Sequence, residues 1–194
     1  MIWTVIAIGY LLGSIPFGLL LTRMIGIDIR AVGSGNIGTT NVLRTGNKGL
    51  AAATLLLDAG KGAAAVVIGR HLGGELWAIV AGTAAFVGHC FPIWLKFRGG
   101  KGVATILGIT LAAAPLAGVI ALATWLGGAL ATRYSSVGGM LAALACPACV
   151  WALTGNSAWA VHLAALAALL LFQHRDNIAR LRAGTESRIG QKST

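Results

Sequence analysis

The segment 33–44, GSGNIGTTNVLR, concentrates side chains and backbone groups that bind anions. Its glycines are interspersed with hydroxyl and amide side chains, and Arg44 closes it. Successive backbone N–H groups in such a turn can surround an anion, and an arginine can hold two phosphate oxygens at once. We therefore predict a phosphate-binding loop, with an ordinary Gly/Asn turn between helices as the alternative. The candidate binding residues in this segment are Ser34, Asn36, Gly38, Thr40, Asn41 and Arg44.

The same stretch matches the pattern G-x-G-x-x-G over residues 33–38, and Asp58 follows Gly38 by 20 residues. In soluble enzymes this combination binds a dinucleotide, provided that a strand precedes the glycines and a helix follows them. Here a membrane-length apolar block, 2–22, and a short polar run precede the glycines. This context argues against a nucleotide and favours another ligand that carries phosphate.

A second glycine-rich segment, GGKG at 99–102, runs into an apolar stretch that begins at residue 103. A phosphate at the start of a helix gains from free N–H groups and from the helix dipole, and Lys101 adds a positive charge. Gly100 and Gly102 let the backbone come close to such a ligand. Because Gly102 stands where a Walker A loop requires Ser or Thr, an ATP-type loop is not predicted. The alternative role of Lys101 is only to mark the cytoplasmic side of the membrane.

A third polar segment, 174–186, follows the last apolar block. In a helix, His174, Asn177 and Leu181 share one face, which directs polar side chains back toward the first two segments. A solvated basic tail is the alternative. Asp58 and Lys61 stand three residues apart inside another apolar block. Ionisable residues in such a place are either functional or paired with one another, and the sequence leaves both roles open.

The composition is that of a membrane protein. Of the 194 residues, 57% are hydrophobic and 10% are charged, and the mean hydropathy is +0.82, whereas a soluble domain is typically about a quarter charged. A helix needs about 20 apolar residues to cross the bilayer. The block 2–22 lacks the features of a cleavable signal peptide, so we expect it to be retained. The candidate spans are 2–22, 49–69, 76–95, 137–154 and 158–173, together with a longer stretch over 103–132.

The stretch 103–132 decides the predicted topology. As one helix it would be about 45 Å long, more than a hydrocarbon core of about 30 Å, and Pro115 interrupts it. If it crosses twice and the N-terminus is outside, every Lys and Arg except Lys61 and Arg70 faces the cytoplasm, including Lys192 in the tail, as the positive-inside rule requires. We therefore predict an all-α polytopic membrane protein with seven transmembrane helices, a short fourth helix and a cytoplasmic C-terminus.

Composition also limits the expected cofactors and partners. Topology and anionic lipid account for the net charge of +10, so we expect no nucleic-acid partner. Cys146 and Cys149 lie in C-P-A-C within an apolar block, where packing is favoured over a redox or metal-binding role. No carboxylate or histidine cluster has the spacing of metal ligands, so we expect no metal and no cofactor. The chain 1–194 is expected to be one integral membrane domain and a monomer.

In combination, the segments GSGNIGTTNVLR, GHCFPIWLKFRGGKGVAT and HRDNIARL resemble the bacterial acyl-phosphate:glycerol-3-phosphate acyltransferase family. The segments LLLDAGKG and RYSS add to a match that covers nearly the whole chain. This resemblance implies an enzyme of the inner (plasma) membrane with an active site that faces the cytoplasm. It implies transfer of a fatty acyl group from acyl phosphate to the sn-1 hydroxyl of glycerol 3-phosphate. The products would be lysophosphatidate and phosphate, in the first step of phospholipid synthesis.

The resemblance also implies roles for individual residues. Those implied for the phosphate of acyl phosphate are Ser34, Asn36, Thr40 and Asn41. Those implied for glycerol 3-phosphate are Arg44, Lys101 and Ser136, with His174 and Asn177 placing its hydroxyls. Because Ser135 and Ser136 are adjacent, either hydroxyl could take the serine role. The residues assigned to catalysis are Ser34, Arg44, Lys101 and His174.

The sequence bears on the mechanism as well. No histidine is followed five residues later by aspartate, and no serine lies in G-x-S-x-G. We therefore predict direct acyl transfer without an acyl-enzyme. The proton of the attacking hydroxyl would pass to His174 or to a phosphate oxygen of the acyl donor, and we favour the latter. The competing hypothesis is an organic-phosphate transporter or anion channel, but the chain has no internal repeat of the kind that many transporters show.

Overall fold

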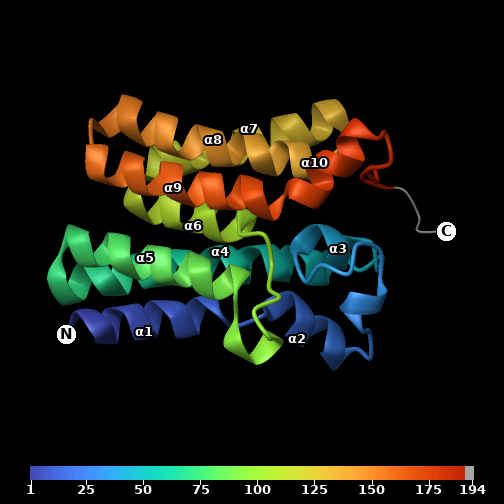
Figure 1. Ribbon diagram of the computed structural model, residues 1–194, viewed down its shortest axis with the longest axis horizontal. Helices are drawn as coiled ribbons and strands as arrows, with labels where there is room; N and C mark the ends of the chain where they lie inside the picture. Colours follow the sequence, from blue (N-terminus) through green and yellow to red (C-terminus); the bar gives the residue numbers. More distant parts are fainter. Residues whose placement is uncertain (191–194) are drawn as a thin grey trace.

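The computed structural model describes residues 1–190, which form an all-helical chain (Figure 1). Residues 191–194, including Lys192, lie outside the described residues. Two 3-10 turns, η1 (Ile29–Ala31) and η2 (Ile93–Leu95), lie in the loops after α2 and α5. The helices are α1 (Ile2–Gly13), α2 (Phe17–Met24), α3 (Thr39–Leu43), α4 (Lys48–Gly73), α5 (Glu75–Cys90), α6 (Val103–Ala113), α7 (Pro115–Thr132), α8 (Ser135–Thr154), α9 (Ser157–Gln173) and α10 (Arg175–Arg182).

Five helical segments of the described chain have the length and composition of membrane spans. A sixth span is present if α9 and α10, which meet at a bend of 55°, count as one. Leu56, Leu130 and Val161 are 70%, 77% and 67% exposed, as contact with lipid tails allows. The chain is therefore an all-helical polytopic membrane protein, as predicted. The five helical segments that are long and apolar enough to cross by themselves are Ile2–Met24, Lys48–Gly73, Glu75–Leu95, Pro115–Thr132 and Ser135–Thr154.

Two groups of helices enclose α6. In Figure 1, α1, α2, α4 and α5 lie on one side of it, and α7, α8 and α9 lie on the other. Phe86, Ile106 and Cys146 are fully buried in the apolar core, so Cys146 has the packing role that its sequence context favoured. A side chain at Gly108 on α6 would overlap the backbone of Ala59 on α4. Such close contact through a small residue is typical of transmembrane helix packing.

The apolar stretch 103–132 divides into α6 and α7, which confirms the predicted break. Ala114 between them is extended (φ −150°, ψ 95°), and Pro115 is the first residue of α7. A residue before proline avoids the helical conformation, and proline suits the first turn of a helix. At the end of α6, the Ala112 carbonyl accepts a hydrogen bond from Arg70 (3.0 Å). A side chain from α4 thus satisfies a carbonyl that the short helix leaves without an internal partner.

The predicted helix 2–22 is instead broken between α1 and α2. Pro16 has no N–H to continue the helix, and the chain leaves the helical conformation there. The Ile15 carbonyl at the break accepts a hydrogen bond from Lys61 Nζ (2.8 Å), which also pairs with Asp58 (2.7 Å). The pairing of Asp58 with Lys61 that the sequence allowed is therefore present, and it supports the break.

The three polar segments lie toward one end of the molecule. The N-terminus and the end of the described chain lie at opposite ends of the long axis (Figure 1). The turns that join α4 to α5 and α8 to α9 lie at the N-terminal end, whereas α3 and α10 lie at the other end. The fold thus places short helices α3 and α10, which carry two of the predicted motifs, at the end of the molecule opposite the N-terminus.

Candidate active site

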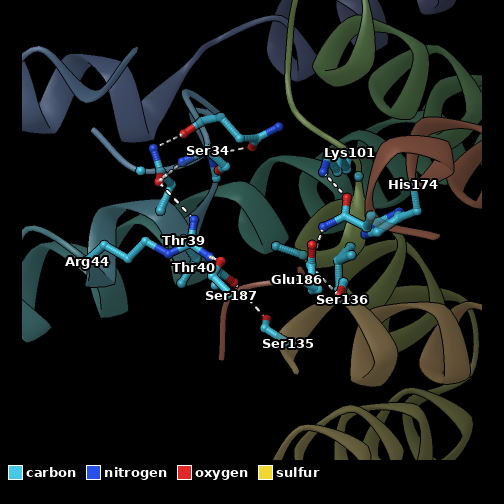
Figure 2. Close-up of a pocket in the computed structure, with 18 of the residues that line it drawn as sticks. Ser34, Thr39, Thr40, Arg44, Lys101, Ser135, Ser136, His174, Glu186 and Ser187 are labelled. Carbon is cyan, nitrogen blue, oxygen red and sulfur yellow. Dashed lines mark hydrogen bonds between the residues drawn. The ribbon is translucent and has the colours of Figure 1, made fainter. Parts of the chain in front are cut away.

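The three polar segments surround one cavity of about 850 Å³ (Figure 2). The start of α8 and the tail after α10 complete its walls. Gly100 is the one predicted site residue that does not border this cavity: it is buried, and its Cα faces the imidazole ring of His89. The predicted site residues that do border it are Ser34, Asn36, Gly38, Thr40, Asn41, Arg44, Lys101, Ser136, His174 and Asn177.

Asn41 on α3 organises the first phosphate loop. Its Nδ2 group donates to the carbonyl oxygens of Ile29 (3.0 Å), Val32 (2.9 Å) and Asn36 (2.8 Å). Its Oδ1 atom accepts a hydrogen bond from the Ser34 N–H (3.1 Å). Asn41 is buried, so these bonds lie away from water. The hydrogen bonds of Asn41 are therefore used within the loop, where they fix the backbone beside Ser34.

A turn and a cross-link shape the same loop. Gly33 adopts a left-handed conformation with φ 51°, which a residue with a side chain rarely adopts. The Thr40 and Ser135 hydroxyls are hydrogen-bonded at 2.7 Å, which ties the loop to the start of α8. Ser136, the neighbour of Ser135, instead donates to a carboxylate on the tail. Both adjacent serines therefore reach the cavity, each with a different partner.

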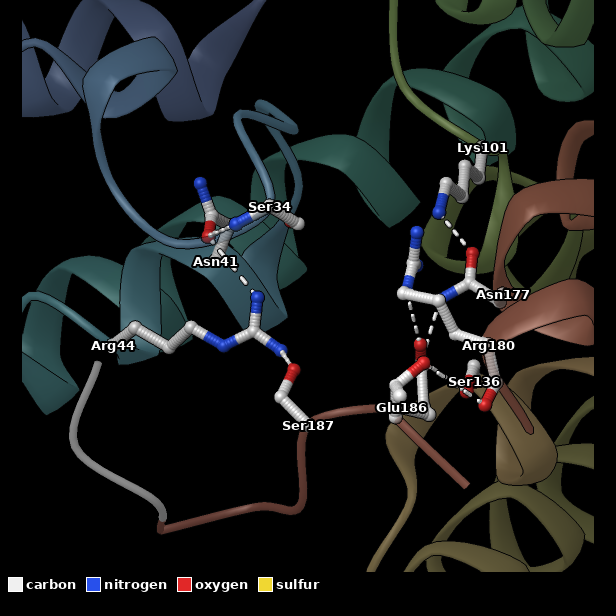
Figure 3. Close-up of polar contacts among 10 residues, drawn as sticks. Ser34, Asn41, Arg44, Lys101, Ser136, Asn177, Arg180, Glu186 and Ser187 are labelled. Atoms are coloured by element: carbon white, nitrogen blue, oxygen red, sulfur yellow. Dashed lines mark hydrogen bonds and ion pairs between the residues drawn. The ribbon is translucent and has the colours of Figure 1, made fainter. Parts of the chain in front are cut away.

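Arg44 follows α3 and faces the tail (Figure 3). Its Nη1 group donates to Asn41 Oδ1 (3.3 Å), and its Nη2 group donates to the Ser187 hydroxyl. Partial burial lowers the pKa of Arg44, nearby Glu186 raises it, and the positive charge of Arg180 lowers it. Arginine nevertheless stays protonated at physiological pH. Arg44 therefore contributes a permanent positive charge to one wall of the cavity.

The second phosphate loop is held by the end of α5. The N–H groups of Gly99 and Gly100 donate to the carbonyl oxygens of Cys90 and His89, both at 3.0 Å. These two bonds fix the backbone immediately before Lys101. The loop then enters α6 through Gly102, whose φ of 88° is again left-handed. The position of Lys101 therefore depends on α5 as well as on α6.

Lys101 supplies a second positive charge on the wall opposite Arg44 (Figure 3). Its Nζ donates to Asn177 Oδ1. Burial and the nearby charge of Arg180 lower the pKa of Lys101 to about 8, against the opposing effect of Glu186. Because this pKa lies just above neutrality, Lys101 is mostly protonated at pH 7 and loses its charge in mildly alkaline solution.

His174 lies at the bend between α9 and α10 and is buried. Its Nδ1 atom is 2.8 Å from the Leu170 carbonyl oxygen. Because a carbonyl oxygen only accepts, Nδ1 carries the proton of the neutral ring, and Nε2 is left as an acceptor. Asn177 borders the same cavity, as the shared helix face predicted. His174 can therefore accept a proton or a hydrogen bond without any change of tautomer.

Comparisons with known proteins agree with this arrangement. The family described as glycerol-3-phosphate acyltransferase matches residues 3–184. Glycerol-3-phosphate acyltransferases of Agrobacterium fabrum and of Bradyrhizobium sp. (strain BTAi1) are 58% and 55% identical to this chain, each over 186 residues. These alignments cover 95% of this chain and 90% and 93% of the two relatives. The chain belongs to the glycerol-3-phosphate acyltransferase family.

The fold of this acyltransferase is also that of a solved relative. The glycerol 3-phosphate form of PlsY, an integral membrane glycerol 3-phosphate acyltransferase, superposes with a TM-score of 0.92 at 34% identity, over 97% of this chain and 96% of that chain. The lysophosphatidic acid form superposes with a TM-score of 0.91 at 33% identity, over 97% and 95%. The resemblance to this enzyme family that the three sequence segments indicated is confirmed over the whole fold.

Glu186 is a residue of the acyltransferase cavity that the sequence analysis missed (Figure 3). Its Oε1 atom accepts hydrogen bonds from Ser136 Oγ (2.7 Å) and Asn177 Nδ2 (2.6 Å), and its Oε2 atom accepts one from Arg180 Nε (2.7 Å). Burial raises the pKa of Glu186, but these three hydrogen bonds and the positive charge of Arg180 together outweigh burial and hold the pKa below its usual value. An acidic residue within a strongly basic tail was the signal that the sequence offered.

Proposed function

We propose that this chain transfers a fatty acyl group from acyl phosphate to the sn-1 hydroxyl of glycerol 3-phosphate. The products are 1-acyl-glycerol 3-phosphate, a lysophosphatidic acid, and inorganic phosphate, and the reaction begins phospholipid synthesis. The family membership supports the acceptor, and the glycerol 3-phosphate form and the lysophosphatidic acid form of the solved relative support the acceptor and the product. The observation that carries the proposal is one cavity with Arg44 and Lys101 on facing walls, because both substrates carry phosphate.

The two substrates would occupy the two walls of the cavity. Leu55, Val103 and Trp125 also border it, so an acyl chain could leave the polar site along apolar side chains and continue into the bilayer. The residues proposed for acyl phosphate are Ser34, Asn36, Gly38 and Thr40, together with Asn41, which acts through the loop backbone that it holds. The residues proposed for glycerol 3-phosphate are Arg44, Lys101, Ser136, His174 and Asn177, with Gly100 acting through the backbone of its loop.

The proposed reaction is direct. The sn-1 oxygen attacks the carbonyl carbon of acyl phosphate, an ester bond forms, and the bond from that carbon to the phosphate oxygen breaks. The main task of the protein is to hold two anions in line, and such placement supplies up to about 7–11 kcal/mol for ideal alignment. Ser34, Arg44 and Lys101 would stabilise the negative charge that develops on the departing phosphate.

The proton of the attacking hydroxyl has two candidate acceptors. A phosphate oxygen of the acyl donor is the one we favour, which makes the reaction substrate-assisted. His174 is the other, because its tautomer leaves Nε2 free of a proton. In either case the proton finally accompanies the released phosphate, so the protein returns to its starting state.

We propose that no metal ion takes part. Within residues 1–190, no group of three or more His, Cys, Asp or Glu side chains is arranged to hold one. Arg44 and Lys101 supply the positive charge that a metal ion would otherwise provide. Chelator-insensitive turnover is expected, and loss of activity in EDTA that magnesium restores would contradict this part of the proposal.

We further propose that the chain crosses the inner (plasma) membrane seven times. The N-terminus would lie outside, and the C-terminus and the active site would face the cytoplasm. Support comes from the segments 23–48 and 174–188, which are rich in Lys and Arg and lie around α3 and α10 at one end of the long axis, and from the opposite placement of the chain ends. In this topology α6 crosses as a short helix, and residues 1–194 form one monomeric domain. An impermeant thiol reagent applied to intact cells is expected to label Asn156→Cys and not Thr185→Cys.

Purified protein tests the activity directly. We expect release of phosphate from palmitoyl phosphate only when glycerol 3-phosphate is present, with formation of the acylated product. The competing transporter hypothesis predicts uptake of labelled glycerol 3-phosphate into proteoliposomes without any acyl donor. Uptake without turnover would replace the proposed function, whereas turnover without uptake would support it.

A further inference from the structure

A charged cluster lies behind the second phosphate loop. Asp58 and Lys61 on α4 form an ion pair, with 2.7 Å between Oδ1 and Nζ. His89 Nδ1 on α5 lies 3.7 Å from the same Asp58 oxygen. All three side chains are buried, with at most 5% of each residue exposed. Asp58 and His89 border the cavity, although neither is among the residues proposed to hold a substrate.

His89 connects this cluster to the loop. Its carbonyl oxygen accepts the hydrogen bond of the Gly100 N–H (3.0 Å). A Cβ atom placed at Gly100 would overlap the imidazole ring of His89, so the ring fills the space directly behind Gly100. The next residue along the chain is Lys101. A shift of the imidazole ring would therefore shift the backbone that carries Lys101.

The polarity of His89 is not explained by packing. Within residues 1–190, His89 Nδ1 has no hydrogen-bond partner, and a buried polar atom in that condition is costly. An apolar ring would fill the same space without that cost. Lys61 does not require His89 as a partner, because its ammonium group already contacts Asp58 and the Ile15 carbonyl (2.8 Å). The one charged group that a polar ring at position 89 can interact with favourably is the nearby carboxylate of Asp58.

We propose that Asp58 and His89 are positioning residues for the acceptor substrate. The carboxylate orients the imidazole, and the imidazole holds the 99–102 loop where Lys101 can reach the phosphate of glycerol 3-phosphate. This inference rests on the proposed function. Neither side chain takes part in the bond changes. The 34–41 segment, which is proposed to bind acyl phosphate, lies across the cavity from Lys101, so the pair acts on the binding of the acceptor and not on the binding of the acyl donor.

The inference predicts a selective kinetic defect. Asp58→Asn and His89→Gln are expected to raise the KM for glycerol 3-phosphate by about tenfold to a hundredfold, since a displacement of about 1 Å in a positioned group can cost that much. The KM for palmitoyl phosphate is expected to stay at the wild-type value. Asp58→Glu, which keeps the carboxylate, is expected to recover part of the affinity for glycerol 3-phosphate.

A double variant separates positioning from charge balance. Asp58→Asn alone leaves Lys61 buried without its counter-ion, which could destabilise the protein. Asp58→Asn combined with Lys61→Met removes both charges, and we expect it to retain the raised KM at a near wild-type unfolding temperature. His162→Asn on α9 is the matched control, because that histidine bonds only to its own helix in the described chain.

Each outcome decides the inference. A wild-type KM for glycerol 3-phosphate in the double variant would show that Asp58 serves only to neutralise Lys61, and would overturn it. Equal rises in the KM values for both substrates, or an unchanged KM for glycerol 3-phosphate, would indicate a merely structural role and would also overturn it. A lower kcat beside a raised KM for glycerol 3-phosphate would support it, because Lys101 is also proposed to stabilise the departing phosphate. Wild-type protein assayed in parallel tests the proposed function separately. If the wild type is active and the variants keep its KM for glycerol 3-phosphate, the role of Asp58 and His89 is refuted while the proposed function stands.

Discussion

A glutamate near each end of the molecule accepts hydrogen bonds from an arginine and from a side chain on another helix. At the N-terminal end, Glu75 accepts from Arg70 (2.5 Å) and from Trp159 Nε1 (2.8 Å). At the other end, Glu186 accepts from Arg180 (2.7 Å) and from Ser136 (2.7 Å). The two glutamates therefore make the same kind of contact, but only the second lies in a cavity that could hold substrates.

The difference between the two ends is the balance of charge. Arg70 is matched by Glu75, and its remaining Nη1 group binds the Ala112 carbonyl. At the other end, Glu186 is shared among neutral donors and Arg180, while Arg44 and Lys101 add positive charge around the cavity. Partly buried charge without a counter-ion is costly. An excess of positive charge is tolerated where an anionic ligand offsets it. This excess, more than the presence of an ion pair, therefore distinguishes the binding site from the structural contact of Arg70 with Glu75, which we call the N-terminal clamp.

The largest expected effect comes from removing one of the excess charges. Lys101→Ala is expected to lower kcat/KM by about 10²–10³-fold, the usual loss when a group that stabilises transition-state charge is deleted. The unfolding temperature is expected to stay near that of the wild type, because Lys101 has no carboxylate partner within hydrogen-bond distance in the described chain. Phosphate release from palmitoyl phosphate, measured with thermal unfolding in detergent, checks both expectations.

A reciprocal control uses the N-terminal clamp. Arg70→Ala is expected to leave kcat/KM unchanged and to lower the unfolding temperature, because it frees the Ala112 carbonyl and Glu75. If Arg70→Ala reduced activity as much as Lys101→Ala, the contrast between a clamp and a site would be wrong.

The two glutamates give a matched pair of substitutions. Glu186→Gln is expected to lower kcat/KM by about tenfold to a hundredfold, since hydrogen bonds to a charged group are worth about 1.5–3 kcal/mol, and Glu186 fixes two residues proposed to touch glycerol 3-phosphate. Glu75→Gln is expected to change only stability, by about 2–4 °C at most for about 1 kcal/mol. Steady-state kinetics and unfolding curves for both variants measure this, and equal kinetic losses would remove the distinction.

The excess charge is also expected to titrate. Burial lowers the pKa of Lys101 to about 8, so the protonated form that binds phosphate prevails below that pH and is lost above it. The kcat/KM for glycerol 3-phosphate reports the free enzyme and is expected to fall about tenfold for each pH unit above this value. The pH dependence of kcat/KM between pH 6 and 10 tests this, and a flat profile up to pH 9.5 would contradict it. Lys101→Arg is expected to remove the alkaline decline.

Local sequence patterns predicted many of the residues that border this cavity and the all-helical membrane fold. Long apolar blocks predicted the helices, and Pro115 predicted the break between α6 and α7. The glycine-rich loops could be predicted because their residues are contiguous in the sequence. The role of Glu186 could not be predicted, because its partners Ser136 and Asn177 lie 50 and 9 residues away and only tertiary packing brings them together. Pro16 was a local signal for the break that the prediction of one helix over 2–22 overlooked, whereas the hydrogen bond from Lys61 to the Ile15 carbonyl depends on tertiary packing.

The smallest expected effect concerns His174, which belongs to the cavity but adds no excess charge when its ring is neutral. If a phosphate oxygen of the donor takes the proton, His174→Asn loses only substrate placement, and kcat is expected to stay within about tenfold of the wild type. If His174 is the base, the loss is expected to reach about 10²–10⁴-fold. Single-turnover rates with saturating palmitoyl phosphate and glycerol 3-phosphate separate the two, since saturation removes any defect in binding. A small loss would mean that the charged wall of Arg44 and Lys101, together with the substrate itself, is sufficient for the chemistry, and that the histidine serves to place a hydroxyl.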